Sequence, residues 1–295
     1  MRFTKMHGCG NDYVYVDATR VSIADPVKTA VFVSDRHFGV GSDGLIMICR
    51  SEVADFRMDM YNADGSRGEM CGNGIRCVGK YVYDYGLTDK TQIKVETLAG
   101  IKDLSLEVEA GLVNSVRVDM GHPVLDVSAI PVIFPQKRMI KKPLEVNGRI
   151  YEVTCVSMGN PHCVIFTDED VREMDIASVG PLFENHQVFP KRINTEFANV
   201  IDRNHIRMRV WERGSGETLA CGTGACATAV AAVLNGLCDE RMELELLGGV
   251  LTIEFDREKD KVYMTGPATT VFEGEISLPP EWESDEDVKI YKKKK

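Results

Sequence analysis

Short strand-like segments dominate the hydrophobic pattern of the chain. Residues 56–61 alternate apolar and polar side chains, as a strand with one buried face should. Residues 13–16 and 163–166 are short apolar runs of the kind found in fully buried strands. The pattern therefore predicts a chain rich in β-sheet.

Two segments have a helical pattern instead. In residues 74–85, apolar side chains recur every three or four positions, and Gly86 follows as a candidate C-terminal cap. Residues 225–234, which precede Gly236, are apolar on almost every side, as in a helix buried all round. We expect an α/β (α+β) fold in which sheet or barrel-like β-structure is wrapped around central helices.

These two helical segments mark an internal repeat. Each follows a cysteine turn, Cys71-Gly-Asn-Gly or Cys221-Gly-Thr-Gly, and the two turns lie 150 positions apart. The flanks keep nearly the same offset, since Tyr61-Asn62 corresponds to Trp211-Glu212. The chain is therefore predicted to hold two tandem copies, 1–121 and 151–266, and the proline-containing connection between them, 122–150, is expected to add strands.

Composition restricts the class of protein. The 295 residues are 44% hydrophobic and 27% charged, which is typical of a soluble globular protein of about two domains. A formal net charge of −10 argues against a general nucleic-acid surface. The apolar runs are too short to span a membrane and no leader-like segment precedes the first motif, so a cytoplasmic location is expected. Lys292 to Lys295 are expected to form a solvated tail.

The nine cysteines are an odd number, which favours thiols in a reducing compartment over a complete disulfide framework. They show no Cys-x-x-Cys or zinc-finger spacing, so no metal is expected. Cys49, Cys155 and Cys238 are interpreted as packing residues. Cys77 and Cys226 do not occupy corresponding positions in the two copies and are interpreted in the same way.

The candidate chemistry lies in Cys71 and Cys221, because a thiolate can act as a base. A helix N-terminus is expected to lower the thiol pKa, and its unpaired N–H groups can bind a carboxylate. The turn glycines let the backbone approach a ligand closely. If two such thiols flank one α-carbon, one removes a proton and the other delivers one, which inverts the centre.

Polar residues around the turns suggest a binding site for a zwitterion. Glu212 offers an acceptor for an ammonium group, and Arg213 a fork for a carboxylate. His162 is a candidate whose motif alone does not make it catalytic. Five asparagines lie at turns or strand ends and could donate or accept hydrogen bonds: Asn11, Asn62, Asn73, Asn160 and Asn194.

At these motifs the chain resembles the diaminopimelate epimerase family. The resemblance is carried by Met6-His-Gly-Cys-Gly-Asn11-Asp12, Asn62-Ala-Asp-Gly-Ser, Cys71-Gly-Asn-Gly-Ile-Arg76-Cys77, Met158-Gly-Asn-Pro-His162 and the long segment from Glu212 to Cys226. It extends from about residue 2 to residue 275, and the segment around Cys221 is the most specific part.

The resemblance implies a cofactor-independent isomerase of lysine and peptidoglycan-precursor biosynthesis that interconverts L,L- and meso-diaminopimelate without pyridoxal phosphate. It implies two pseudo-symmetric repeat domains with the active site in the cleft between them. The first would comprise 1–121 plus returning strands at 267–285, and the second 122–266, with a charged tail at 286–295.

By matching position, Cys71 and Cys221 would be the acid/base pair, with His162 and Glu212 supporting catalysis. Side chains would hold the substrate at Asn11, Asn62, Asn160, Asn194, Glu212 and Arg213. The backbone at Gly72-Asn73 and Gly222-Thr223 would hold the reacting carboxylate.

Two positions depart from the family pattern. Gly44 stands where some members carry a glutamine that contacts substrate, so only a main-chain contact is expected there. Phe272 stands where some members have a tyrosine at a dimer contact, and a homodimer is expected.

Three other functions remain open on the residues. A proline or hydroxyproline racemase also uses two thiols, but its substrate has no distal carboxylate for the asparagines and Arg213 to bind. An isomerase of the phenazine-biosynthesis type would lack the cysteine pair. A redox-sensing protein would join the two thiols in a switchable disulfide.

Overall fold

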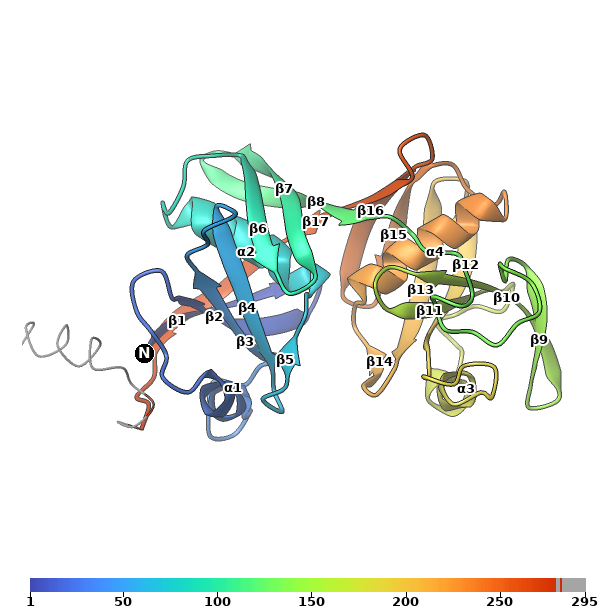
Figure 1. Cartoon of the computed structure of the whole chain (residues 1–295), viewed down its shortest axis with the longest axis horizontal. Helices are drawn as coiled ribbons and strands as arrows, with labels where there is room; N and C mark the ends of the chain where they lie inside the picture. Colours follow the sequence, from blue (N-terminus) through green and yellow to red (C-terminus); the bar gives the residue numbers. More distant parts are fainter. Residues whose placement is uncertain (280–281, 283–295) are drawn as a thin grey trace, which may run out of the picture. The chain divides into compact units, whose positions relative to one another are not determined.

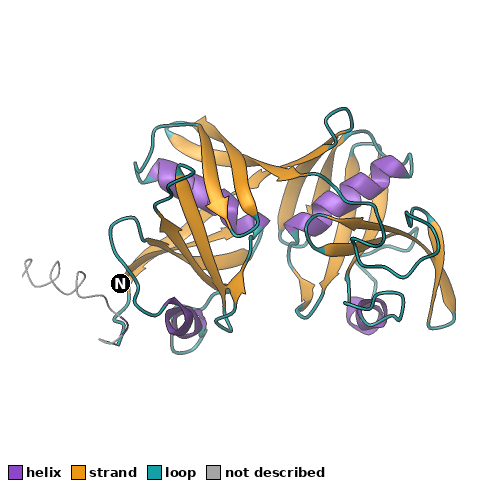
Figure 2. Ribbon diagram, in the orientation of Figure 1, coloured by secondary structure: helices purple, strands orange, loops and turns teal. Residues whose placement is uncertain are grey.

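The computed structural model describes residues 1–279 and 282 (Figure 1). The expected charged tail, 286–295, and the last part of the expected returning segment lie outside these residues. The described chain divides into two compact units, one made of residues 1–117 with 267–279 and 282, and the other of residues 118–266. Each unit contains a long helix surrounded by strands (Figure 2).

The first unit is built on the hairpin of β1 (Arg2–Gly8) and β2 (Asn11–Asp17). It continues with α1 (Pro26–Ser34), β3 (Gly44–Cys49), β4 (Phe56–Asn62), β5 (Arg67–Gly68), α2 (Gly72–Asp84), β6 (Gln92–Thr97) and β7 (Gly100–Glu109). Strand β8 (Leu112–Gly121) leads into the second unit, and β18 (Thr269–Glu275) returns to pair with β1.

The second unit has the same sequence of elements after an added strand. It comprises β9 (Lys142–Val146), β10 (Arg149–Ser157), β11 (Pro161–Phe166), α3 (Ile176–Glu184), β12 (Asn194–Asp202), β13 (His205–Glu212), β14 (Gly216–Thr218), α4 (Gly222–Leu234), β15 (Arg241–Leu246), β16 (Gly249–Asp256) and β17 (Lys261–Pro267). The connection at 122–150 contributes β9 and the start of β10, which confirms the expected extra strands.

Strand pairing confirms the repeat at the level of topology. In the first unit β2 is parallel to β3, β3 antiparallel to β4, and β4 parallel to β6. In the second unit β11 is parallel to β12, β12 antiparallel to β13, and β13 parallel to β15. The two copies therefore share one fold, and corresponding residues occupy corresponding places in it.

The central helices lie where the periodicity predicts them. Helix α2 packs against β1, β2 and β7, and α4 packs against β10, β11, β12 and β16. Both end before a glycine in the left-handed region, Gly86 at φ 67° and Gly236 at φ 71°. Glycine adopts this conformation without a steric penalty because it has no β-carbon. Both begin earlier than predicted, at Gly72 and Gly222, because the turn glycines belong to the first helical turn.

Each unit also has a second, shorter helix that the hydrophobic pattern did not predict. Helix α1 is capped by Asp25, whose carboxylate accepts the Lys28 N–H at 3.0 Å, and Pro26 begins the helix. Helix α3 is capped by Asp175, whose carboxylate accepts the Ser178 N–H at 3.1 Å. An aspartate cap is a signal that the sequence carries, but these helices are too short for a clear period.

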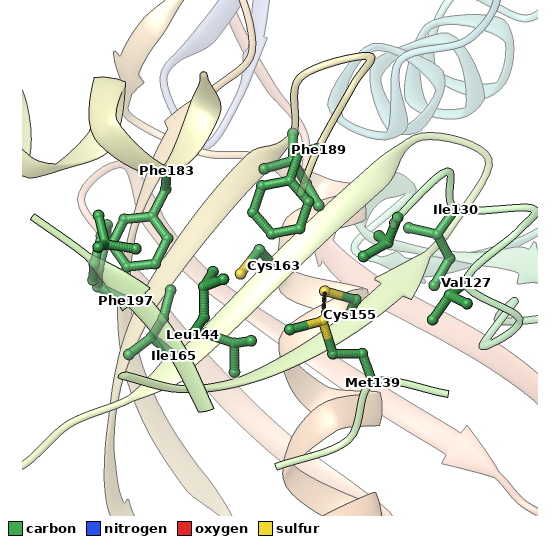
Figure 3. Close-up of a cluster of buried hydrophobic side chains, with 14 of the residues drawn as sticks. Val127, Ile130, Met139, Leu144, Cys155, Cys163, Ile165, Phe183, Phe189 and Phe197 are labelled. Carbon is green, nitrogen blue, oxygen red and sulfur yellow. Dashed lines mark hydrogen bonds between the residues drawn. The ribbon is translucent and has the colours of Figure 1, made fainter. Parts of the chain in front are cut away.

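The core of the second unit contains a cluster of buried side chains from β10, β11, β12 and α3 (Figure 3). The Phe183 ring meets the Phe197 ring edge-on at 5.6 Å between centroids. Cys155 lies in this cluster with its sulfur 3.7 Å from that of Met139, which confirms its interpretation as a packing residue. Burial of each phenylalanine stabilises the unit by about 1.5–3 kcal/mol.

Among the described residues, no helix is both long and apolar enough to cross a bilayer.

Candidate active site

The first cysteine turn places a sulfur at the start of α2. Cys71 is the N-cap residue, with extended backbone (φ −126°, ψ 118°), and its sulfur accepts the Gly74 N–H at 3.3 Å. A β-carbon on Gly74 would lie 2.7 Å from Cδ1 of Ile46 in β3. Glycine therefore allows the helix to approach the sheet closely at the third residue after the cysteine.

A network of charged groups orients Asn11 toward this sulfur. The Asn11 amide nitrogen donates to Asp43 at 2.8 Å, which leaves Asn11 Oδ1 facing the Cys71 sulfur at 3.1 Å. Asp43 is paired with Arg36, and Arg36 also pairs with Asp12. Because an amide oxygen only accepts, the Cys71 thiol donates its proton to Asn11 in this arrangement.

The remaining predicted residues of the first unit lie near β3, β4 and α2. Gly44 faces Asn62 across β3 and β4, and a β-carbon on Gly44 would lie 2.1 Å from the Tyr61 carbonyl oxygen. Position 44 thus offers only its main chain, as expected. The Asn62 amide donates to Ser66 Oγ at 2.9 Å, and Asn73 is buried in the first turn of α2.

Arg76 is a residue to which sequence reasoning assigned no role. Its side chain is fully buried in α2 and donates to the carbonyl of Gly72 at 3.2 Å and to Asn73 Oδ1 at 3.0 Å. A third donor reaches the Pro267 carbonyl at 3.1 Å. The guanidinium therefore holds the turn from within the unit and places a positive charge at the end of the helix where Cys71 lies.

The second cysteine turn has a different electrostatic environment. Cys221 is the N-cap residue of α4, and its sulfur lies 3.5 Å from Thr223 Oγ1. Burial raises the pKa of the Cys221 thiol well above its usual value, and the carboxylates of Glu212 and Glu196 raise it further. The backbone N–H of Gly224 at the helix N-terminus lowers this pKa, as predicted, but desolvation and the two carboxylates outweigh that effect at Cys221.

His162 and Glu196 form a buried pair next to this turn. Both side chains are fully inaccessible, and His162 Nδ1 lies 2.7 Å from Glu196 Oε1. The other ring nitrogen, Nε2, lies 3.0 Å from Asn160 Oδ1. Sequence reasoning missed Glu196, because the burial of residues 194–198 is seen only in the structure.

The other predicted residues of the second unit gather at the ends of β12 and β13. Asn194 donates to the Pro161 carbonyl at 2.8 Å and accepts the Arg213 N–H at 2.8 Å, so both ends of its amide already have protein partners. Glu212 accepts from Thr218 Oγ1 at 2.5 Å. The Arg213 side chain is exposed and donates to the Lys191 carbonyl.

The structure therefore brings the predicted residues together within each unit. Asn11 and Asn73 lie with Cys71, and Gly72 begins the same helix. Asn160, His162 and Asn194 lie together through hydrogen bonds and register, and Gly222 and Thr223 begin the helix at Cys221. Among residues 1–279 and 282, no group of three or more His, Cys, Asp or Glu side chains is placed to hold a metal ion.

Comparisons with known proteins agree on one family. The family model described as diaminopimelate epimerase matches residues 3–125 and 154–271. A diaminopimelate epimerase from Agathobacter rectalis is 58% identical over 285 residues, covering 94% of this chain and all of the relative. One from Methanococcus maripaludis is 55% identical over 278 residues, with the same shares covered.

Solved structures share the fold at much lower identity. A phenazine biosynthesis protein of the PhzF family from Bacillus anthracis superposes with a TM-score of 0.65 at 18% identity, covering 94% of this chain and 99% of that one. A hydroxyproline epimerase from Agrobacterium vitis superposes with a TM-score of 0.64 at 13% identity, covering 96% of each chain. These similarities establish the two-repeat fold. The substrate has to be inferred from the residues of the site.

Proposed function

The chain belongs to the diaminopimelate epimerase family, and we propose that it interconverts L,L- and meso-diaminopimelate, an isomerase reaction of lysine and peptidoglycan-precursor biosynthesis. The observation that supports this function best is the matched pair of cysteine N-caps. Cys71 and Cys221 occupy the same position in two copies of one fold, each at the start of a buried helix.

The proposed chemistry is proton transfer at the α-carbon by two thiols, without a cofactor. One cysteine, as thiolate, removes the α-proton, and the thiol of the other delivers a proton to the opposite face. The main-chain N–H groups of Gly72-Asn73 and Gly222-Thr223 bind the α-carboxylate, whose negative charge is stabilised at a helix N-terminus. His162 and Glu212 support this chemistry from the second unit.

Substrate selection is proposed to come from residues that differ between the copies. Asn62 and Glu212 occupy equivalent strand ends, but one carries a neutral amide and the other a carboxylate. Arg213 supplies a cation that can pair with the distal carboxylate, while Asn11, Asn160, Asn194 and the main chain of Gly44 supply further hydrogen bonds. Proline, which has no distal carboxylate, would leave Arg213 without that partner.

The test is epimerisation of L,L-diaminopimelate in deuterium oxide, with proline and hydroxyproline as parallel substrates. We expect meso product with deuterium at the inverted carbon, and no inversion of the imino acids. Activity on proline alone would replace this proposal by the racemase alternative. Product without solvent deuterium would contradict proton exchange through the thiols.

Two further properties belong to this proposal. A homodimer is supported by the exposure of two apolar side chains in β18, Val271 at 53% and Phe272 at 47%. Light scattering at a range of concentrations measures the mass directly.

A cytoplasmic location is supported by the chemistry, because both thiols must stay reduced to transfer protons.

A further inference from the structure

Glu196 is a buried carboxylate in the middle of β12. Its side chain is wholly inaccessible to solvent, and burial raises the pKa of its carboxyl although His162 opposes that shift. A buried ionisable group is costly unless it is paired and hydrogen-bonded. A carboxyl group at this position therefore costs free energy of folding.

The repeat shows that packing does not require this group. Glu196 corresponds to Ile46 in the first unit, 150 positions earlier, and His162 corresponds to Tyr13 by the parallel pairing of β2 with β3 and of β11 with β12. Ile46 is also fully buried and packs behind Gly74, as Glu196 packs behind Gly224. An apolar side chain thus satisfies the same position in the same fold, so Glu196 needs a reason other than packing.

The contacts of Glu196 lead to the cysteine turn. A β-carbon on Gly224 would lie 2.7 Å from Glu196 Oε1 and 3.3 Å from the Cys221 sulfur, so the carboxylate and the sulfur flank the same glycine. His162 from β11 lowers the pKa of the Glu196 carboxyl group, and Glu212 from β13 raises it. Glu196 in turn raises the pKa of Cys163 in β11 and of Cys221.

Hydrogen bonding determines how many protons the pair holds. Asn160 Oδ1 only accepts, so His162 Nε2 carries a proton. A second proton lies between His162 Nδ1 and Glu196 Oε1, since two acceptors cannot face each other at 2.7 Å. Whether that proton resides on the ring or on the carboxyl group, the pair is neutral and the ring is fixed at both nitrogens.

We propose that Glu196 is a positioning residue of the second cysteine turn: its carboxyl group, which flanks Gly224, fixes the His162 ring and, through the ring, Asn160. The proposal rests on the epimerase function inferred above and adds a residue to its machinery. The consequence is that the second turn depends on a buried carboxylate, whereas the first turn reaches the same helix geometry with an isoleucine.

The experiment compares Glu196→Gln, which keeps the size and the hydrogen-bonding capacity, with Glu196→Ile, which installs the residue of the first unit. Ile46→Val is the matched core change in the first unit. We expect Glu196→Ile to lower kcat by about 10²-fold with little change in KM, because misplacement of a supporting group has this effect. Glu196→Gln is expected to stay within about tenfold of wild type, since an amide still holds the ring, and Ile46→Val is expected to keep its kcat.

Nitrogen-15 NMR of the imidazoles in the ligand-free protein reports on the hydrogen bonds of the His162 ring. A purely structural role of Glu196 would leave these signals unchanged. His162 is assigned by loss of its signals in His162→Gln. Its ring N–H signal should be protected from exchange in wild type and in Glu196→Gln, and lost in Glu196→Ile. Circular dichroism and thermal melting identify any variant that fails to fold.

Two results would overturn the proposal. One is a folded Glu196→Ile protein with wild-type kcat and an unchanged His162 signal. The other is a Glu196→Gln protein as impaired as Glu196→Ile while its His162 ring stays protected. If wild type itself does not epimerise diaminopimelate, the proposed function fails, but the NMR comparison still tests the link between Glu196 and His162.

Discussion

The two cysteine turns share a frame and differ in charge. Each cysteine is the N-cap residue of a buried helix, and each turn has a glycine in close contact with a strand. Behind the first turn lies a buried cation, Arg76, whereas behind the second lie the carboxylates of Glu196 and Glu212. Duplication thus supplied two equivalent thiols, and substitutions around them made the two thiols unequal.

The difference also extends to the groups that face each sulfur. Cys71 is half-buried and donates to an asparagine held by Asp43, while Cys221 is buried beside a threonine hydroxyl. In the proposed reaction, unequal thiols set the resting roles for one direction, with one sulfur as the base and the other as the acid, and these roles exchange in the reverse direction. Three experiments test whether the two turns differ in this way.

The largest effect is expected from removing either thiol. Cys71→Ser and Cys221→Ser should each lower kcat by about 10²- to 10⁴-fold, the usual contribution of a general acid or base. A serine hydroxyl has nearly the same size but is a much weaker acid, so the helix N-cap is kept. Epimerisation rates in both directions provide the measurement. If either variant kept near-normal turnover, the corresponding turn would have no catalytic role.

Much of this comparison could be predicted from the sequence, because it rests on a repeat. Matching offsets identified the two turns, both central helices and most of the polar residues around them. Helix α2 shows a clear helical period and α4 is apolar on almost every side, whereas α1 and α3 have only nine residues each and leave a weak pattern.

The electrostatic differences could not be predicted in the same way. Arg76 and Glu196 act through burial, and a sequence does not state how deeply a charged side chain is buried or which atoms it meets. The helix N-terminus suggested a lowered thiol pKa, but the desolvation of Cys221 depends on the strands that cover it. The burial of these two side chains and the desolvation of Cys221 both come from tertiary packing, which local patterns do not encode.

The second prediction exchanges the equivalent glycines for alanine. In Gly224→Ala the new methyl group would meet Glu196 Oε1, whereas in Gly74→Ala it would meet Cδ1 of Ile46, each at 2.7 Å. Both changes overpack the helix against the sheet by about 1–3 kcal/mol, less a gain in helix propensity of about 0.5–1 kcal/mol.

Only Gly224→Ala also displaces the carboxylate that holds His162. We therefore expect it to lose about 10- to 100-fold in kcat beyond the loss in Gly74→Ala. Urea unfolding and steady-state kinetics of both variants separate stability from activity. Equal kinetic losses in the two variants would show that the glycines serve only packing.

The third prediction concerns alkylation of the two thiols, which proceeds through the thiolate. Cys71 is half-buried, while the pKa of Cys221 is raised well above its usual value by burial and by Glu212 and Glu196. Iodoacetamide at pH 7–9 should therefore label Cys71 before Cys221 in the ligand-free protein, as measured by peptide mass spectrometry.

Replacing Glu212 by Gln tests the cause of this difference. A raised pKa means that the folded protein favours the protonated thiol, so the Cys221 thiolate forms only as the pH rises toward that raised pKa. Removing one neighbouring negative charge lowers the pKa and should increase labelling of Cys221 by about tenfold at a fixed pH, with the labelling of Cys71 as internal control. If the two cysteines react equally in wild type, or if Glu212→Gln changes both rates alike, the two turns are electrostatically equivalent.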